Sequence, residues 1–102
     1  MEPKELNQSF VTGDIGGWPY RLLLTVSLSE AGFVVGTIFG GVLLHLKLSD
    51  IRHVEPLDGI WAIGFAVHYM QNDRLKVATI RTRKYKDWLR LFLQNRVDTS
   101  NQ

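Results

Sequence analysis

The chain has 102 residues, of which 45% are hydrophobic and 22% charged, and a formal net charge of +2 at neutral pH. This length and composition predict one domain with a single core and exclude intrinsic disorder. The absence of cysteine excludes disulfides, thiolate nucleophiles and zinc–thiolate sites, in keeping with a cytoplasmic location. The small net charge gives no indication of nucleic-acid binding.

Targeting and membrane-spanning segments are not expected. The first ten residues have no apolar run behind a basic start, so they do not resemble a secretory signal. A membrane-spanning helix needs about 20 residues, and the longest uncharged run, residues 31–46, is shorter than that. It contains the adjacent glycines Gly40 and Gly41, which are typical of a hairpin turn.

The first half of the chain predicts an N-terminal arm followed by strands. Residues 1–18 are polar with scattered glycines and are expected to form the arm. From Tyr20 to Ser29, apolar and polar residues alternate with period two, which predicts a half-buried strand. Two more strands are predicted over residues 33–39 and 42–48.

Three further strands follow the Ser49–Asp50 turn. Residues 51–55 form a short fourth strand that ends before Pro56, and residues 60–70 and 74–82 form the fifth and sixth. Small residues recur along one face of residues 60–70, which predicts close approach by another element, such as a packed helix or a bend of the sheet.

After residue 82 the apolar period changes to about 3.6 residues, which predicts an amphipathic helix over residues 83–95. Thr82 is its expected N-cap, and residues 97–102 form a tail. The inner stripe of the helix consists of Tyr85, Trp88, Leu89 and Phe92. The predicted core consists of Leu22, Leu24, Val26, Leu44, Leu46, Trp88, Leu89 and Phe92.

Consecutive antiparallel strands followed by one helix favour a small β-barrel plugged by that helix. Three segments resemble the pleckstrin-homology (PH)-like superfamily, particularly the short bacterial PH domains and their GRAM-like relatives. They are the strand-turn-strand LSEAGFVV at 28–35, the segment LKLSDIRHVE at 46–55 and the helix KYKDWLRLFL at 84–93. The resemblance covers residues 20–95 and implies a mainly β, PH-like barrel of about seven antiparallel strands, capped by a C-terminal helix, over residues 19–96. A different small barrel is the alternative.

The resemblance also implies a class of function. PH-like barrels mostly recognise protein segments or surfaces, and some bacterial members self-assemble through exposed strand edges. The chain is therefore expected to be a non-catalytic binding module whose partner is another protein or a second copy of itself. Phosphoinositide-binding PH domains resemble one another in a basic motif around their first hairpin, whereas the turn at residues 29–32 is short and acidic. Inositol-phosphate binding at the usual place is therefore not expected.

The residues that carry chemistry do not form a recognisable active site. His45 and His53 lie on consecutive predicted strands and could be neighbours, but the three histidines match no ligand motif, so no metal is predicted. Asp50 is explained by its place in the Ser49–Asp50 turn, so it is not taken as a catalytic acid. The serines lack the nucleophile-elbow context of a hydrolase, and no glycine-rich segment precedes a helix as in a phosphate-binding loop. A hydrolase-type enzyme is thus the disfavoured alternative. No catalytic residue, cofactor or small-molecule substrate is predicted.

Charge is distributed unevenly along the chain. Residues 1–73 carry four basic and eight acidic side chains, whereas residues 74–96 carry eight basic side chains against Asp87 alone. These cations form either a solvated face that also discourages sheet pairing, or an attractive surface for an anionic membrane or acidic partner. Nucleic acid is not expected, because the aromatic residues among the cations belong to the predicted core. The helical period predicts that four cations face the solvent. These are the residues expected to contact an anionic partner: Arg83, Lys84, Lys86 and Arg90.

Overall fold

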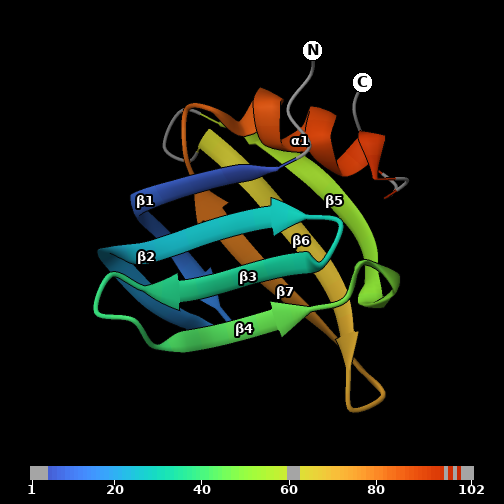
Figure 1. The fold of residues 1–102 in the computed structure, drawn as a ribbon, viewed down its shortest axis with the longest axis horizontal. Helices are drawn as coiled ribbons and strands as arrows, with labels where there is room; N and C mark the ends of the chain where they lie inside the picture. Colours follow the sequence, from blue (N-terminus) through green and yellow to red (C-terminus); the bar gives the residue numbers. More distant parts are fainter. Residues whose placement is uncertain (1–4, 60–62, 96, 98, 100–102) are drawn as a thin grey trace.

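The computed structural model describes residues 5–59, 63–95, 97 and 99, which form a seven-stranded antiparallel sheet and one C-terminal helix (Figure 1). The strands are β1 (Leu6–Ile15), β2 (Trp18–Ser29), β3 (Gly32–Thr37), β4 (Val42–Leu46), β5 (Ile51–Asp58), β6 (Ile63–Gln71) and β7 (Arg74–Arg81). A short 3₁₀ turn, η1 (Leu48–Asp50), precedes β5, and the helix α1 spans Tyr85–Gln94. The predicted mainly β fold with one C-terminal helix is confirmed.

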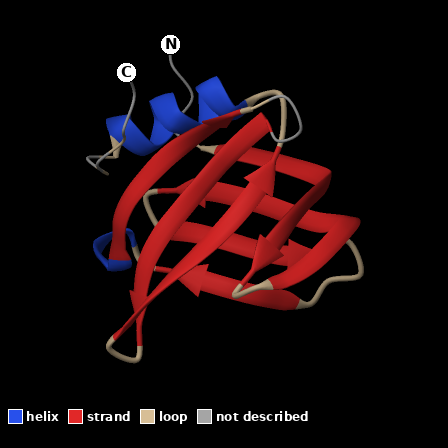
Figure 2. Cartoon of the chain, turned by 180° about the vertical axis from the view of Figure 1, so that it is seen from behind, coloured by secondary structure: helices blue, strands red, loops and turns tan. Residues whose placement is uncertain are grey.

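The strands follow the order β4-β3-β2-β1-β7-β6-β5, so that β1 joins the two halves of the sheet by pairing with both β2 and β7. Figure 2 shows the two halves crossing as the sheet coils. β4 and β5 stand at the two ends of this order, and no pairing joins them in the described part of the chain. The sheet is therefore strongly coiled, and its hydrogen bonds do not close it into the expected barrel.

The first strand, β1, lies in the segment expected to be an arm. Its alternation is hidden because the register shifts twice, between Ser9 and Val11 and between Val11 and Gly13. Between the first two lies Phe10, whose backbone is in the left-handed region with φ of 60°. Each shift breaks the period-two pattern that identifies a strand in a sequence. For this reason the sequence pattern predicts an arm over these residues and not the strand β1.

Two other boundaries differ from the sequence prediction. β5 continues through Pro56, which pairs with Phe65 of β6. Since β5 is an end strand of the sheet, it can accommodate a residue that lacks an N–H. At the start of β6, residues 60–62 lie outside the described residues, as do the side chain of Leu22 and most of the predicted tail. In that tail, Val97 is buried and Thr99 forms a parallel bridge with Val54.

The core lies between the concave face of the sheet and α1, which covers one end of the coil (Figure 1). The rings of Phe33, Phe65, Trp88 and Phe92 form a cluster there, with Trp88 stacked on Phe65 at a centroid distance of 5.6 Å. All the predicted core side chains that the structure describes are buried: Leu24, Val26, Leu44, Leu46, Trp88, Leu89 and Phe92.

Gln8 of β1 connects the helix to the sheet. Its side-chain oxygen accepts hydrogen bonds from the indole N–H of Trp88 and from the hydroxyl of Thr82, both at 3.0 Å. Thr82 in turn accepts the backbone N–H of Lys84, which is the N-cap of α1. The prediction that Thr82 is the N-cap is therefore wrong by two residues, because Thr82 stabilises the turn ahead of the helix instead. In the described residues, α1 is too short and too polar to cross a membrane.

Candidate functional site

The predicted contact cations surround the N-terminal part of α1. Arg83 and Lys84 lie in the turn before the helix, and Lys86 and Arg90 are one turn apart on its outer face. All four side chains are exposed, and none forms an ion pair within the described residues. Their exposure was correctly predicted from the helical period, whereas their role in binding stays a prediction.

The electrostatics at this end of the helix favour an anion. The N-terminus of a helix carries the positive end of the helix dipole, where cations are unfavourable and anions are stabilised. Here the first turn contains Lys86 beside Asp87, and Lys84 occupies the cap. The cations therefore add to the field of the helix instead of opposing it.

The basic residues of β7 do not all join this surface. Arg81 ends the strand on the side of α1, whereas Arg74 begins it at the β6–β7 hairpin, at the opposite end of the molecule (Figure 1). Lys76 follows Arg74 at that far end. Arg96 lies outside the described residues. Of these three residues of β7, only Arg81 therefore lies at the end of the strand near α1.

The outer edge of β4 is one end of the sheet. The backbone N–H of Ile38 bonds to the carbonyl of Leu23, which fixes the alternation of hydrogen bonds along β3. By that alternation, Phe33 and Val35 of β3 form their backbone hydrogen bonds with β4. Their partners in the register, Leu46 and Leu44, therefore direct their own N–H and C=O groups toward β3. The N–H and C=O groups of the intervening residue, His45, then point to the outside, where no described strand pairs with them. The register shift between Val35 and Gly36 interrupts this alternation at Leu43.

The other end of the sheet is better covered. Thr99 forms its parallel bridge with Val54 of β5, and α1 packs beside the same strand (Figure 1). β4 has no equivalent cover among the described residues. Of the two end strands, β4 is therefore the one open to pairing.

Apolar side chains adjoin the β4 edge. Phe39 in the β3–β4 turn is 82% exposed and Val42 at the start of β4 is 66% exposed. The turn is held by a hydrogen bond from the Thr37 N–H to the Gly41 carbonyl at 2.7 Å, and Gly40 supplies its positive φ of 101°. The exposed Phe39 is thus held by an ordered turn just before β4.

The three histidines do not converge on one site. His45 is exposed on β4, whereas His53 pairs in register with His68 on the far end of the sheet, with ring centroids 5.5 Å apart. The Nε2 atom of His68 lies 2.8 Å from the Oε1 atom of Glu55. In the described residues, no group of three or more histidine and acidic side chains is arranged to hold a metal. His45 and His53, which could have been neighbours on consecutive strands, are on the opposite end strands β4 and β5.

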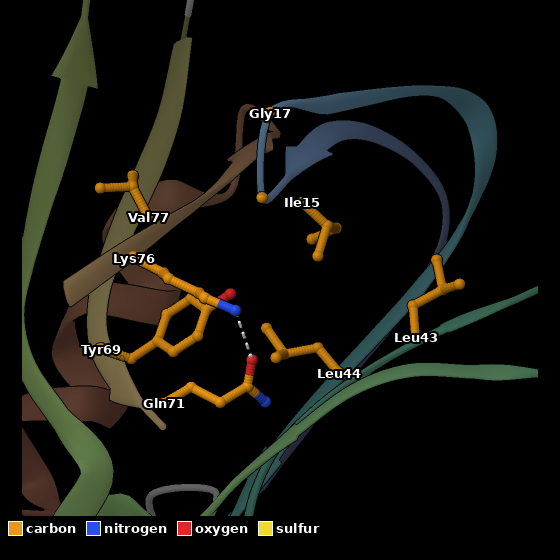
Figure 3. A pocket seen from close by; sticks show the side chains of 9 residues that line it. Ile15, Gly17, Leu43, Leu44, Tyr69, Gln71, Lys76 and Val77 are labelled. Atoms are coloured by element: carbon orange, nitrogen blue, oxygen red, sulfur yellow. Dashed lines mark hydrogen bonds between the residues drawn. The ribbon is translucent and has the colours of Figure 1, made fainter. Parts of the chain in front are cut away.

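A cavity of about 430 Å³ opens at the end of the coil opposite α1 (Figure 3). Its walls come from the β1–β2 turn, β4, β6 and β7, with Tyr69, Gln71 and Lys76 facing Leu43 and Leu44 (Figure 3). Sequence reasoning did not single out Tyr69 or the inward position of Lys76. The available signal was the period of β7, which places Lys76 on the same face as the buried Ala78 and Ile80.

The location of the first hairpin also needs correction. The turn at residues 29–32, taken as the first loop of the PH-like pattern, joins β2 to β3. The first hairpin of the chain is β1–β2, which turns at Gly16 and Gly17 with φ of 59° and 87°. The turn that lacks a basic motif is therefore the second hairpin of the chain, and the expectation against inositol phosphates stays a prediction.

No protein-family model matches the chain, and no curated protein sequence matches it. Its function is therefore inferred from its own surfaces: the free β4 edge, the basic helix and the cavity.

Proposed function

We propose that the chain is a non-catalytic, PH-like interaction module that associates with a second copy of itself through the outer edge of β4. The observation that carries this proposal is the outward-facing backbone of His45 on an end strand of the sheet, whose N–H and C=O groups have no strand partner among the described residues. Unpaired strand edges are natural templates for another strand. The competing possibility is that a strand of a different protein pairs with this edge.

The order of the strands supports the PH-like part of the proposal. An up-and-down series that coils until β1 meets β7, with one C-terminal helix over one end, is the arrangement that the resemblance implies. The gap between β4 and β5 gives the module its open edge.

A second copy fits the edge because antiparallel pairing is self-complementary. Two β4 strands related by a two-fold axis offer each other the same alternating donors and acceptors. The exposed Phe39 and Val42 lie at one end of β4, so each copy brings an apolar group to the flank of the new pair. Their burial adds a hydrophobic contribution to the backbone hydrogen bonds.

Replacing His45 with proline is expected to abolish self-association while leaving the monomer folded. Proline removes an N–H that points away from β3 and places its ring at the free edge, a position where proline is tolerated in sheets. His45→Thr changes the same side chain but keeps the N–H, so it should associate like the original chain. Mass measured by light scattering over a range of concentrations distinguishes the variants.

A strictly monomeric original chain would rule out self-association, and specific capture of one other protein that His45→Pro abolishes would assign the edge to that protein. Equal association of His45→Pro and His45→Thr would show that β4 is not the contact. Circular dichroism of both variants confirms that the monomer stays folded.

Binding to an anionic membrane surface through α1 is the alternative function, and the four exposed cations favour it, since none forms an ion pair within the described residues. Three of them, Arg83, Lys84 and Lys86, lie at the positive end of the helix dipole. Reversing Lys86 and Arg90 to glutamate is expected to abolish salt-sensitive sedimentation with phosphatidylserine vesicles. The same change should alter the free energy of unfolding by less than about 1 kcal/mol, as exposed charges do.

The matched control reverses Arg52 and Arg74, two exposed cations outside α1 and the turn before it, so that the net charge changes equally. If both double variants lose binding to the same extent, attraction depends on net charge and not on the helix. If neither loses it, the cations of α1 are structural.

A further inference from the structure

Two polar side chains lie on the inner face of the sheet at the mouth of the cavity opposite α1. Tyr69 and Lys76 are cross-strand partners in the β6–β7 register, so they project from the same face. That face is apolar further along, where it carries the buried Val67 and Ala78. A lysine in this position directs its ammonium group toward the cavity, where it donates to the Gln71 side-chain oxygen at 3.1 Å (Figure 3).

The hydroxyl of Tyr69 is a free hydrogen-bonding group. The residue is only 2% exposed, yet its hydroxyl has no hydrogen-bond partner within the described residues. No buried polar side-chain atom in that part of the chain is sealed without a partner, so the hydroxyl reaches the open space of the cavity that Tyr69 lines. Burial raises the pKa of Tyr69, which keeps the phenol protonated and able to donate at neutral pH.

The remaining walls are apolar. Ile15 closes the cavity beside the β1–β2 turn, and Leu43 and Leu44 form the side opposite Tyr69 (Figure 3). A volume of about 430 Å³ is within the range of small-molecule pockets. At the share of about 30 Å³ that a water molecule takes in the liquid, the cavity holds on the order of a dozen non-hydrogen atoms.

We propose that this cavity binds a monocarboxylic acid with a short apolar chain, whose carboxylate accepts hydrogen bonds from Lys76 and Tyr69 and whose chain lies against Ile15, Leu43 and Leu44. One ammonium group balances one negative charge, and it is the single cationic side chain among the described residues that line the cavity. A phosphate dianion lacks a second cation there. This site is separate from the outward backbone groups of β4, so it does not depend on the proposed self-association.

Octanoate and octanol test the proposal, because they share a chain and differ in the charged end. Titration of each into the full chain is followed by amide chemical shifts, with shifts expected around Ile15, Leu44 and Tyr69. Tyr69→Phe keeps the ring and removes the hydroxyl, and Lys76→Met keeps an apolar stem and removes the charge. Each is expected to weaken octanoate binding by about tenfold or more, as loss of a charged hydrogen bond does, and to leave octanol binding unchanged.

Arg74→Met is the matched control, because Arg74 is an exposed cation on the same strand that does not line the cavity. It should bind octanoate like the original chain. The absence of shifts in cavity residues at millimolar octanoate would overturn the proposal. So would equal octanoate affinity in Lys76→Met, since Lys76 would then serve only to protect the part of β7 that extends beyond β1 from pairing with another strand.

Discussion

Replacing Trp88 with alanine is expected to lower the free energy of unfolding by about 3–5 kcal/mol, the cost typical of removing a fully buried large aromatic ring. The ring is 1% exposed and contacts Phe33 and Phe65, and no other side chain of α1 both enters the aromatic cluster and bonds to β1. Its removal leaves a cavity between helix and sheet and deprives Gln8 of one of its two donors. Chemical denaturation followed by far-ultraviolet circular dichroism measures the loss.

Two variants make this result specific. Leu93→Ala truncates a residue of the same helix that is 56% exposed, so it should cost little. Trp88→Phe keeps most of the apolar ring and removes the indole N–H, so its loss of stability should lie between those of Trp88→Ala and Leu93→Ala. This variant should fold even if Trp88→Ala does not. An alanine variant as stable as Leu93→Ala would show that α1 does not cover the core.

The strands that the sequence predicted well are those whose inner residues keep a strict period of two. Leu24 and Val26 are buried on β2, and Leu44 and Leu46 are buried on β4, because the period is regular at these positions. The register shift of β4 lies before Leu44. β1 contains the same kind of residues, but its two register shifts place Val11 out of phase with Leu6. A local pattern cannot reveal a strand whose phase changes twice in ten residues.

The candidate sites also differ in how much of each could be predicted from the sequence. Exposure of Lys86 and Arg90 follows from the helical period alone, so sequence was sufficient. The free edge of β4 required the order of strands, which depends on the pairing of β1 with β7 at opposite ends of the chain. The cavity joins Ile15, Leu44 and Tyr69 from three distant segments, and no local pattern brings such residues together.

The small residues of β6 include Gly64, where another element approaches closely, as predicted. Gly64 lies opposite Arg81 in the β6–β7 register. A Cβ atom on Gly64 would meet the backbone carbonyl oxygen of Ile80 and would approach the Cα atom of Arg81 to 2.8 Å. The close approach expected on this face therefore comes from the neighbouring strand β7.

Gly64→Ala is accordingly expected to destabilise the chain by about 3 kcal/mol, at the upper end of overpacking costs, because the atoms it meets belong to backbone and cannot move aside as a side chain does. Gly41→Ala is the matched control, since its added Cβ meets only the Thr37 hydroxyl oxygen at 3.5 Å, an ordinary contact. Thermal and chemical denaturation should show a large loss for Gly64→Ala and little change for Gly41→Ala. If both variants were equally stable, β6 and β7 would have to separate at Gly64 without cost, and the tight coil that brings β1 against β7 would not depend on this glycine.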